Sequence, residues 1–259
     1  MQNYVKSEFY RVSHSRSIYS LTAILVILSF LLNAVLGWFG RMDGSSFPYA
    51  TTSFSYSNLV VQPMLFCVIG AIIGIVFYDG NKKNGNLKNT IAFGISRKKV
   101  FAGECIVATV SAIFSLIIVL SVYIVSAVVF LEHTGPVSLM DLYTEIPAVF
   151  LIAVASLISG IVCIEAFEKD SIGIIIWIAI WFIIPKVFFY LGLRFDTIHS
   201  IAMWMPDNFF GTSGMTVNMS QSITAWGTTE GMAKCLVSGI IGIIVFFLSG
   251  IVLLRKREL

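Results

Sequence analysis

Six apolar runs constrain the fold of this chain more than any other feature. They cover residues 18–39, 59–78, 106–130, 146–164, 171–191 and 235–254. Each is close to the roughly 20 helical residues that cross about 30 Å of hydrocarbon. Hydrophobic residues make up 57% of the chain and charged residues 12%, against about 45–50% and about 25% in soluble domains. We therefore predict an all-α integral membrane protein with six transmembrane helices in one domain, residues 1–259.

Helices account for these runs better than strands or a cleaved leader. Residues 172–184 are apolar on every side, whereas barrel strands alternate with period two over about 10 residues. Basic residues precede the first run, but that run is too long for a signal-peptide core and lacks a small-x-small cleavage site. We therefore keep it as a span.

The distribution of Lys and Arg predicts the orientation, because cytoplasmic loops hold the excess of basic residues. An arrangement with both termini inside places thirteen of the seventeen on inner segments: Lys6, Arg11, Arg16, Lys82, Lys83, Lys88, Arg97, Lys98, Lys99, Lys169, Arg255, Lys256 and Arg257. Residues 79–104 then form the first cytoplasmic loop. This topology explains the net charge of +3, so no nucleic-acid partner is inferred.

Two segments outside the runs are predicted to lie at the membrane surface. Residues 1–17 place Val5, Phe9 and Val12 on one face, which is typical of a helix in the interface plane; a basic tail is the alternative. Residues 192–234 are too apolar for a solvated loop. Irregular backbone in lipid must be buried or line a cavity, so we expect short re-entrant helices there, or else an external cap with interfacial aromatic residues.

The sequence shows no site for chemistry. Gly80 and Gly85 have the spacing of a phosphate-binding loop, but Asn86 and Leu87 stand where Lys and Ser or Thr are needed. The His residues fall in separate segments, and the four Cys form no spaced pair. We therefore predict no enzyme, no catalytic residue and no metal or cofactor bound by this chain. If it moves a solute, a partner must supply the energy.

Lys186 is the one charge inside a run. It lies about 22 Å from the inner edge, counting from Ser171 at 1.5 Å per residue. A charge within the membrane costs about 2.5–3.5 kcal/mol on insertion scales and often marks function. Two interpretations stay open: the ammonium snorkels or pairs locally, or Lys186 contacts a substrate path.

The loop at residues 79–104 has the pattern helix, turn, helix. Leu87 and Ile91 lie on one side of a short predicted helix. Gly94 follows, where a left-handed C-terminal cap costs least. Ser96 is placed to cap the next helix through its hydroxyl.

Arg97, Lys98 and Lys99 occupy the first turn of that second helix, the end where the helix dipole disfavours cations by about 0.3–1 kcal/mol each. Something outside the helix must favour them. Anionic headgroups would do so by about 1 kcal/mol per basic residue. A protein partner that grips the short helix and the turn is the other interpretation.

The loop as a whole resembles a known one. Asp79, Gly85, Lys88 and then Gly94-Ile95-Ser96-Arg97 before the third run are similar to the first cytoplasmic loop of ABC-2-type permeases, the membrane subunits of ATP-driven exporters. The resemblance extends to six spans, an interfacial N-terminal helix and a partly re-entrant segment before the last span. The chain departs from the family pattern with Gly94 where Pro is common and with Glu104 where Lys often opens the third span.

The resemblance implies a coupling helix in this loop that docks on a cytoplasmic ATPase subunit. The implied coupling surface consists of Leu87, Ile91, Gly94, Ser96 and Arg97. Two ATPase subunits would bind ATP and Mg²⁺, and the chain would pair with a second copy or a sibling permease in the bacterial plasma membrane.

The length of the chain and the character of its N-terminal segment resemble those of permeases that export lantibiotic-like antimicrobial peptides. This resemblance implies an apolar or amphipathic substrate, such as a peptide or a drug. Two alternatives stay open: an ATP-independent channel or secondary carrier, and a non-transporting sensor or assembly subunit.

Overall fold

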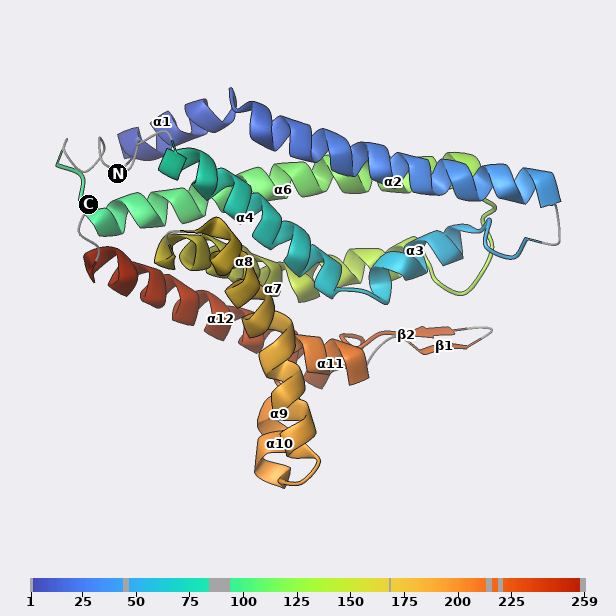
Figure 1. Cartoon of the computed structure of the whole chain (residues 1–259). Helices are drawn as coiled ribbons and strands as arrows, with labels where there is room; N and C mark the ends of the chain where they lie inside the picture. Colours follow the sequence, from blue (N-terminus) through green and yellow to red (C-terminus); the bar gives the residue numbers. More distant parts are fainter. Residues whose placement is uncertain are drawn as a thin grey trace.

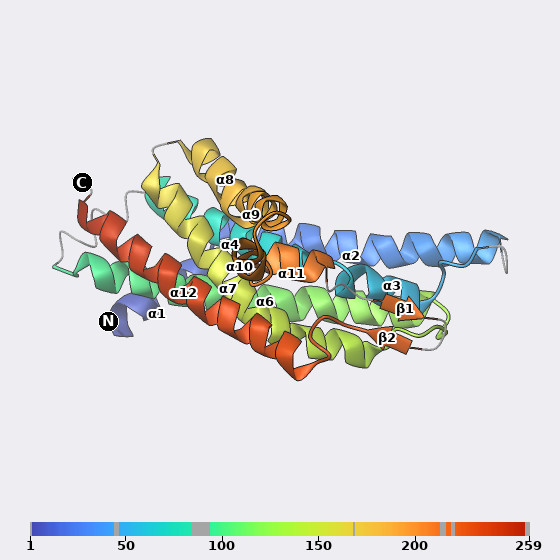
Figure 2. The same ribbon diagram turned by 90° about the horizontal axis from the view of Figure 1, so that it is seen from below.

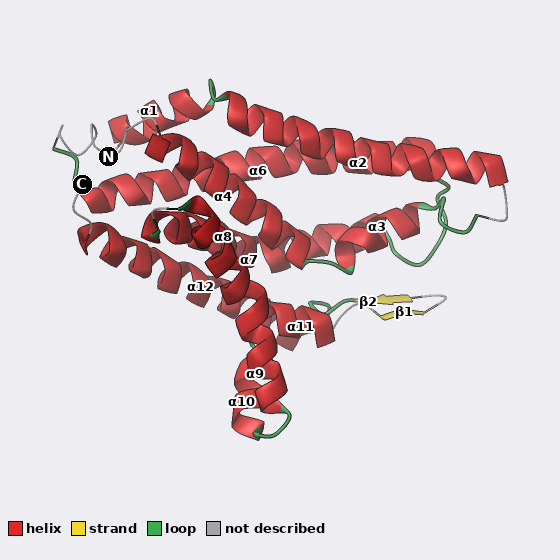
Figure 3. Ribbon diagram, viewed as in Figure 1, coloured by secondary structure: helices red, strands yellow, loops and turns green. Residues whose placement is uncertain are grey.

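The computed structural model describes residues 2–43, 47–83, 94–167, 169–212, 216–218 and 221–256, and it is a bundle of long helices (Figure 1). In chain order the elements are α1 (Gln2–Val12), α2 (Arg16–Asp43), α3 (Thr52–Val60), α4 (Met64–Lys83), α6 (Arg97–Phe130), α7 (Leu139–Ala166), α8 (Asp170–Ile178), η2 (Ala179–Ile183), α9 (Ile184–Gly192), α10 (Asp196–Ala202), α11 (Pro206–Thr212), β1 (Thr216–Asn218), β2 (Gln221–Ile223) and α12 (Thr229–Lys256). The all-helical prediction missed the small antiparallel hairpin of β1 and β2 (Figure 3).

Five helical segments are long and apolar enough to cross a membrane, or six if α3 and α4 form one span. Five of the predicted runs lie inside α2, α6, α7, the α8–η2–α9 segment and α12. The prediction of membrane-spanning helices is therefore confirmed for these runs.

The second run differs from the prediction, because residues 59–78 do not form one straight helix. The chain bends by 65° between α3 and α4. Pro63 lies in the break; it has no N–H to donate, and it disfavours helical backbone at the preceding Gln62. Thr51 caps the start of α3 by accepting a hydrogen bond from the Phe54 amide at 3.2 Å.

The central helix of the bundle is α7, since 67% of its membrane window is buried, against 11–28% in the other four unbroken candidate spans. Small residues on its neighbours allow the close approach. A Cβ added at Gly74 of α4 would lie 2.7 Å from the Leu157 carbonyl oxygen, and one at Gly242 of α12 would lie 2.9 Å from the Cβ of Ala155. Gly74 and Gly242 thus lie at close helix contacts, where small residues are common in membrane proteins.

Polar side chains also join the helices. Ser156 of α7 donates to the Cys67 carbonyl of α4 at 2.6 Å. The indoles of Trp177 and Trp181 both donate to the Ser159 hydroxyl, at 3.1 and 2.8 Å. These contacts hold α8 and η2 against α7. The fifth run stays helical past Pro185, which lies in the first turn of α9 directly after the π-helical turn η2.

A buried network joins the other side of the bundle. Asn33 of α2 is fully buried. Its amide donates to the Tyr123 carbonyl at 2.9 Å and to the Ser126 hydroxyl at 2.8 Å, both on α6. Its oxygen accepts from Ser55 of α3 at 2.7 Å. Three helices are therefore fixed at one buried amide.

Both chain termini lie at one end of the bundle, together with the start of α6, and the loops that join α2 to α3 and α6 to α7 lie at the other end (Figure 1). This grouping agrees with the predicted placement of both termini on one side. The assignment of this side to the cytoplasm stays a prediction.

The segment from residue 192 to residue 234 contains the short helices α10 and α11 as well as the hairpin. α10 packs back along α9, and the two project from the bundle beyond α11 (Figure 1). Figure 2 shows them nearly end-on. Short helices in this segment are thus confirmed, whereas their re-entry into the outer leaflet stays a prediction.

Two acidic residues lie inside long helices. Glu104 and Glu145 are inside α6 and α7 and are buried, at 2% and 0% exposure. Both helices begin well before the apolar runs at residues 106 and 146, so these two carboxyl groups lie within helices and not in loops.

Candidate functional site

The coupling segment predicted at residues 79–104 is described only in part. Leu87 and Ile91 lie outside the described residues. Gly94, Ser96 and Arg97 are described, so three of the five predicted coupling residues can be placed.

Gly94 has the backbone that the sequence indicated. Its φ is +83°, in the left-handed region that costs a Cβ-bearing residue free energy. Among the described residues, no other group lies within 4 Å of a Cβ built there, so backbone conformation and not crowding by them selects glycine.

Ser96 occupies the N-cap position of α6 with extended backbone, but its hydroxyl makes no capping hydrogen bond. The predicted hydroxyl cap is therefore wrong. The Ser96 carbonyl accepts instead from the amides of Lys99, at 2.9 Å, and Val100, at 3.1 Å. Serine is thus compatible with this turn without contributing a side-chain cap.

The three basic residues at the start of α6 do not share one environment. Arg97 is half-buried and donates from Nη1 to the Leu254 carbonyl oxygen of α12 at 2.9 Å. Lys98 and Lys99 are exposed. Arg97 therefore anchors α6 within the chain, while the two lysines face outward, where headgroups or a partner would meet them.

The helix α1 packs beside this anchor. Its buried residues are Tyr4, Glu8 and Val12, whereas Val5 and Phe9 of the predicted face are only half-buried. The difference arises because α1 packs against α6, where Gly103 leaves space for the Tyr4 ring. The alternative of an unstructured basic tail is excluded by the helix.

Charged groups tie α1 to its neighbours. Arg11 pairs with Glu8 and lies over the Phe77 ring of α4, 5.4 Å from its centroid. Burial raises the pKa of Tyr4, and nearby Glu104 and Glu8 act in the same direction. This end of the bundle is therefore one packed unit of α1, α4, α6 and α12.

Lys186, the predicted candidate for a substrate path, pairs locally. Its Nζ lies 2.9 Å from Oδ2 of Asp207 on α11. Both residues line a cavity of about 350 Å³ beside the break between α3 and α4. Local pairing, one of the two interpretations of Lys186, is thus observed, and contact with a substrate stays a prediction.

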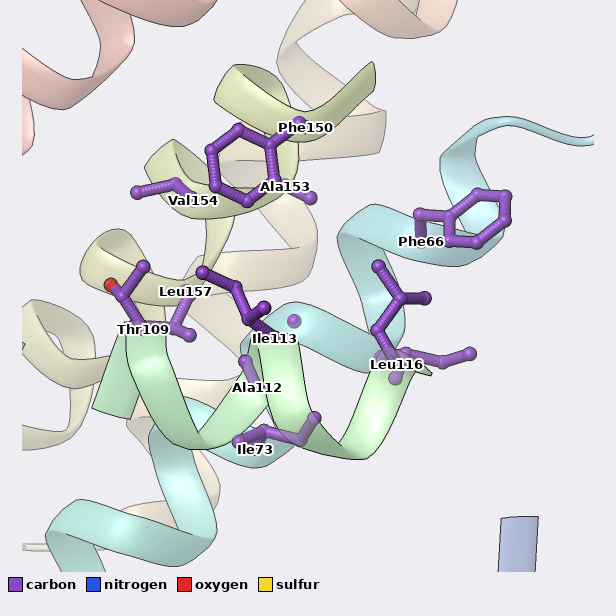
Figure 4. A pocket seen from close by; sticks show the side chains of 12 residues that line it. Phe66, Ile73, Thr109, Ala112, Ile113, Leu116, Phe150, Ala153, Val154 and Leu157 are labelled. Carbon is purple, nitrogen blue, oxygen red and sulfur yellow. The ribbon is translucent and has the colours of Figure 1, made fainter. Parts of the chain in front are cut away.

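Two other spaces among the described helices are apolar. A cavity of about 50 Å³ lies between α4, α6 and α7, and apart from Thr109 its side chains are apolar, including Phe66, Leu116 and Phe150 (Figure 4). Ligand sites usually measure about 300–1,000 Å³, so this space is a packing gap. A larger crevice of about 360 Å³ between α2, α4 and α6 is almost wholly apolar.

Sequence reasoning missed Asp207, Asn33 and Ser159 as important residues. Asp207 stood in an apparently external segment, and a single Asn or Ser in an apolar run carries no periodic signal. The sequence feature that could have identified Asn33 and Ser159 is the presence of a polar residue within an apolar run, because a polar side chain in a span needs a hydrogen-bond partner.

Membrane-length helices packed through small residues and buried polar bonds define a multi-pass membrane protein. The sequence matches the family described as ABC-2 family transporter protein over residues 4–186, more than half of the chain. The chain therefore belongs to the ABC-2 transporter family, a membrane transport domain without a nucleotide site of its own. The predicted resemblance is confirmed at this level. A search of curated proteins found no match.

Proposed function

We propose that this chain is the permease subunit of an ATP-driven exporter in the bacterial plasma membrane. In this proposal both termini are cytoplasmic, and two separate ATPase subunits bind ATP and Mg²⁺. A second permease copy or a sibling completes the transport path. The substrate is apolar or amphipathic, and an antimicrobial peptide or a drug fits this class.

One observation carries the proposal: the left-handed turn at Gly94 leads directly into Arg97, which is bonded to α12. A force applied to the segment before Gly94 would therefore reach two membrane helices through one short connection. Such a connection is what an external motor needs. The exposed Lys98 and Lys99 add positive charge for contact with a partner or with anionic headgroups.

Membership of the ABC-2 family supports the same interpretation. The chain would change access to the transport path by moving its helices: closure of the ATPase subunits would push the coupling segment and tilt the helices. In this mechanism no residue of the chain has a catalytic role.

The test is affinity purification of the tagged full-length chain from native membranes. We expect an ATPase subunit to copurify, and we expect transport in proteoliposomes only when it is present with ATP. Flux by the purified chain alone would identify a channel or secondary carrier. A stable complex whose ATP hydrolysis ignores every transported compound would identify a sensor or assembly subunit. Either result overturns the proposal.

A further inference from the structure

The cavity at Lys186 differs chemically from the two apolar spaces described above. An acid, a base and an amide line it, namely Asp207, Lys186 and Gln62, together with apolar side chains. Its volume of about 350 Å³ falls within the range of small-molecule sites. The space can therefore hold a charged group beside an apolar body.

The two charges are held in place by the fold. Asn208, the neighbour of Asp207, is 1% exposed and donates to the Pro185 carbonyl at 2.7 Å and to the Ala202 carbonyl at 3.1 Å. These bonds fix the start of α11 next to Lys186. The ion pair is consequently a built feature of the site and not a chance contact between two flexible surface side chains.

The two members of the pair differ in exposure. The Asp207 side chain is 13% exposed and that of Lys186 is 48% exposed. Oδ2 of Asp207 is buried, and its partner is the Lys186 ammonium, 2.9 Å away. A ligand ammonium carries the same positive charge and the same N–H donors as the Lys186 ammonium, so this carboxylate suits either group.

The two helix ends at the break between α3 and α4 add their electrostatic field to the same cavity. Val61, Gln62, Pro63, Met64 and Leu65 all line it, so the C-terminal end of α3 and the N-terminal end of α4 both face it. A helix N-terminus favours anions and a C-terminus favours cations. Broken membrane helices form substrate sites in transporters on this principle.

We propose that this cavity binds a zwitterionic amphiphile, a molecule with an ammonium and an anionic group beside an apolar body. The ammonium would replace Lys186 at Asp207. The anionic group would take Lys186, in the favourable field at the N-terminus of α4. The apolar body would lie along Met64, Phe182 and Phe210. This inference rests on the proposed transport function and names its substrate class.

A ligand of one charge would fit less well. If it opens the ion pair, it leaves either Lys186 or Asp207 without its charged partner, and this is most unfavourable for Asp207, whose side chain is only 13% exposed. A zwitterion replaces both partners at once. The requirement for two opposite charges is therefore the distinguishing mark of the site.

The test uses the purified full-length chain in an uncharged detergent and follows ligand stabilisation by thermal unfolding. Four probes carry the same 14-carbon chain: lysophosphatidylethanolamine, 2-aminotetradecanoic acid, tetradecylamine and tetradecanoate. We expect the two zwitterions to bind at least tenfold more tightly than either singly charged probe. If only the first zwitterion shows this preference, the ligand is of the phospholipid type; if only the second does, it is of the amino-acid type.

Variants separate the site from general charge effects. Lys186→Met and Asp207→Asn should each abolish the tenfold preference, and the exchanged pair Lys186→Asp with Asp207→Lys should regain it. The matched control is Glu230→Gln, which breaks the 2.8 Å pair with Lys234 on α12 and should change nothing. Equal binding of all four probes, or a folded single variant that keeps the preference, overturns the inference.

The comparison of probes in the unaltered chain decides the question even if a variant does not fold. It requires no ATPase subunit. A missing ATPase partner would therefore refute the proposed function without altering this result, and an absent ligand preference would leave the proposed function standing.

Discussion

Arg97 at the start of α6 donates a hydrogen bond from Nη1 to the backbone carbonyl oxygen of Leu254 near the end of α12, at 2.9 Å. The two residues are 157 positions apart. The bond satisfies a carbonyl in the last turn of α12, which has no partner within the helix, and it places a positive charge where the helix dipole favours one. The third and the last membrane helices are thereby joined at the end that holds both termini.

Replacing Arg97 with Ala should weaken this junction. We expect the free energy of unfolding to fall by about 1 kcal/mol, because a charge-assisted bond is lost at a half-buried position. Thermal unfolding in detergent measures the change. Lys98→Ala, which removes an exposed charge one residue away, is the control and should have almost no effect. Equal losses in both variants would show that the contact with Leu254 contributes nothing specific.

Gly94 should tolerate only residues that accept positive φ. Gly94→Val forces a β-branched residue into a left-handed conformation that costs roughly 1–2 kcal/mol. Under the proposed function, ATP hydrolysis should become uncoupled from transport while membrane insertion is kept.

Gly94→Asn is the matched variant, because asparagine visits this region more readily, and it should keep most of the coupling. Substrate-stimulated hydrolysis and export, measured together in proteoliposomes, test both variants. Normal coupling in Gly94→Val would refute the role assigned to the turn.

Close packing of α4 on α7 should depend on Gly74. A Cβ at this position would approach the Leu157 carbonyl oxygen to 2.7 Å, so Gly74→Ala should destabilise the protein by about 1–3 kcal/mol.

On the same helix, a Cβ added at Gly80 would have no group of the described residues within 4 Å. Gly80→Ala should therefore be neutral or stabilising by up to about 1 kcal/mol through helix propensity. Unfolding in a denaturing detergent series compares the two variants. The packing argument fails if Gly74→Ala is as stable as Gly80→Ala.

Removal of the Ser159 hydroxyl should loosen the fifth helical segment. Ser159→Ala takes away the acceptor shared by the Trp177 and Trp181 indoles, and we expect a loss of about 2 kcal/mol with a shift in tryptophan emission. The control, Ser111→Ala, removes a buried hydroxyl that donates within its own helix, to the Val107 carbonyl, and it should leave the emission unchanged. An unchanged emission spectrum and unchanged stability in Ser159→Ala would show that the two indole–hydroxyl bonds do not hold this segment in place.

Much of the fold could be predicted because apolar length is a local property. The amino-acid composition of the runs at residues 18–39 and 235–254 is enough to predict that they are helices and roughly where those helices begin and end. Gly94 was predictable for the same reason, since a glycine between two helical patterns signals a left-handed turn. Ser96 failed as a capping side chain because the rotation of a hydroxyl depends on its surroundings and not on its position in the sequence.

The sequence by itself determined that this chain forms membrane-length helices and that its basic residues gather in particular loops, since hydrophobic burial and charge exclusion act on each segment separately. Only the tertiary structure decided which helix is central, that Lys186 meets Asp207, and that Arg97 meets Leu254. These contacts join residues far apart in the chain, and their free energy exists only once the intervening helices have packed.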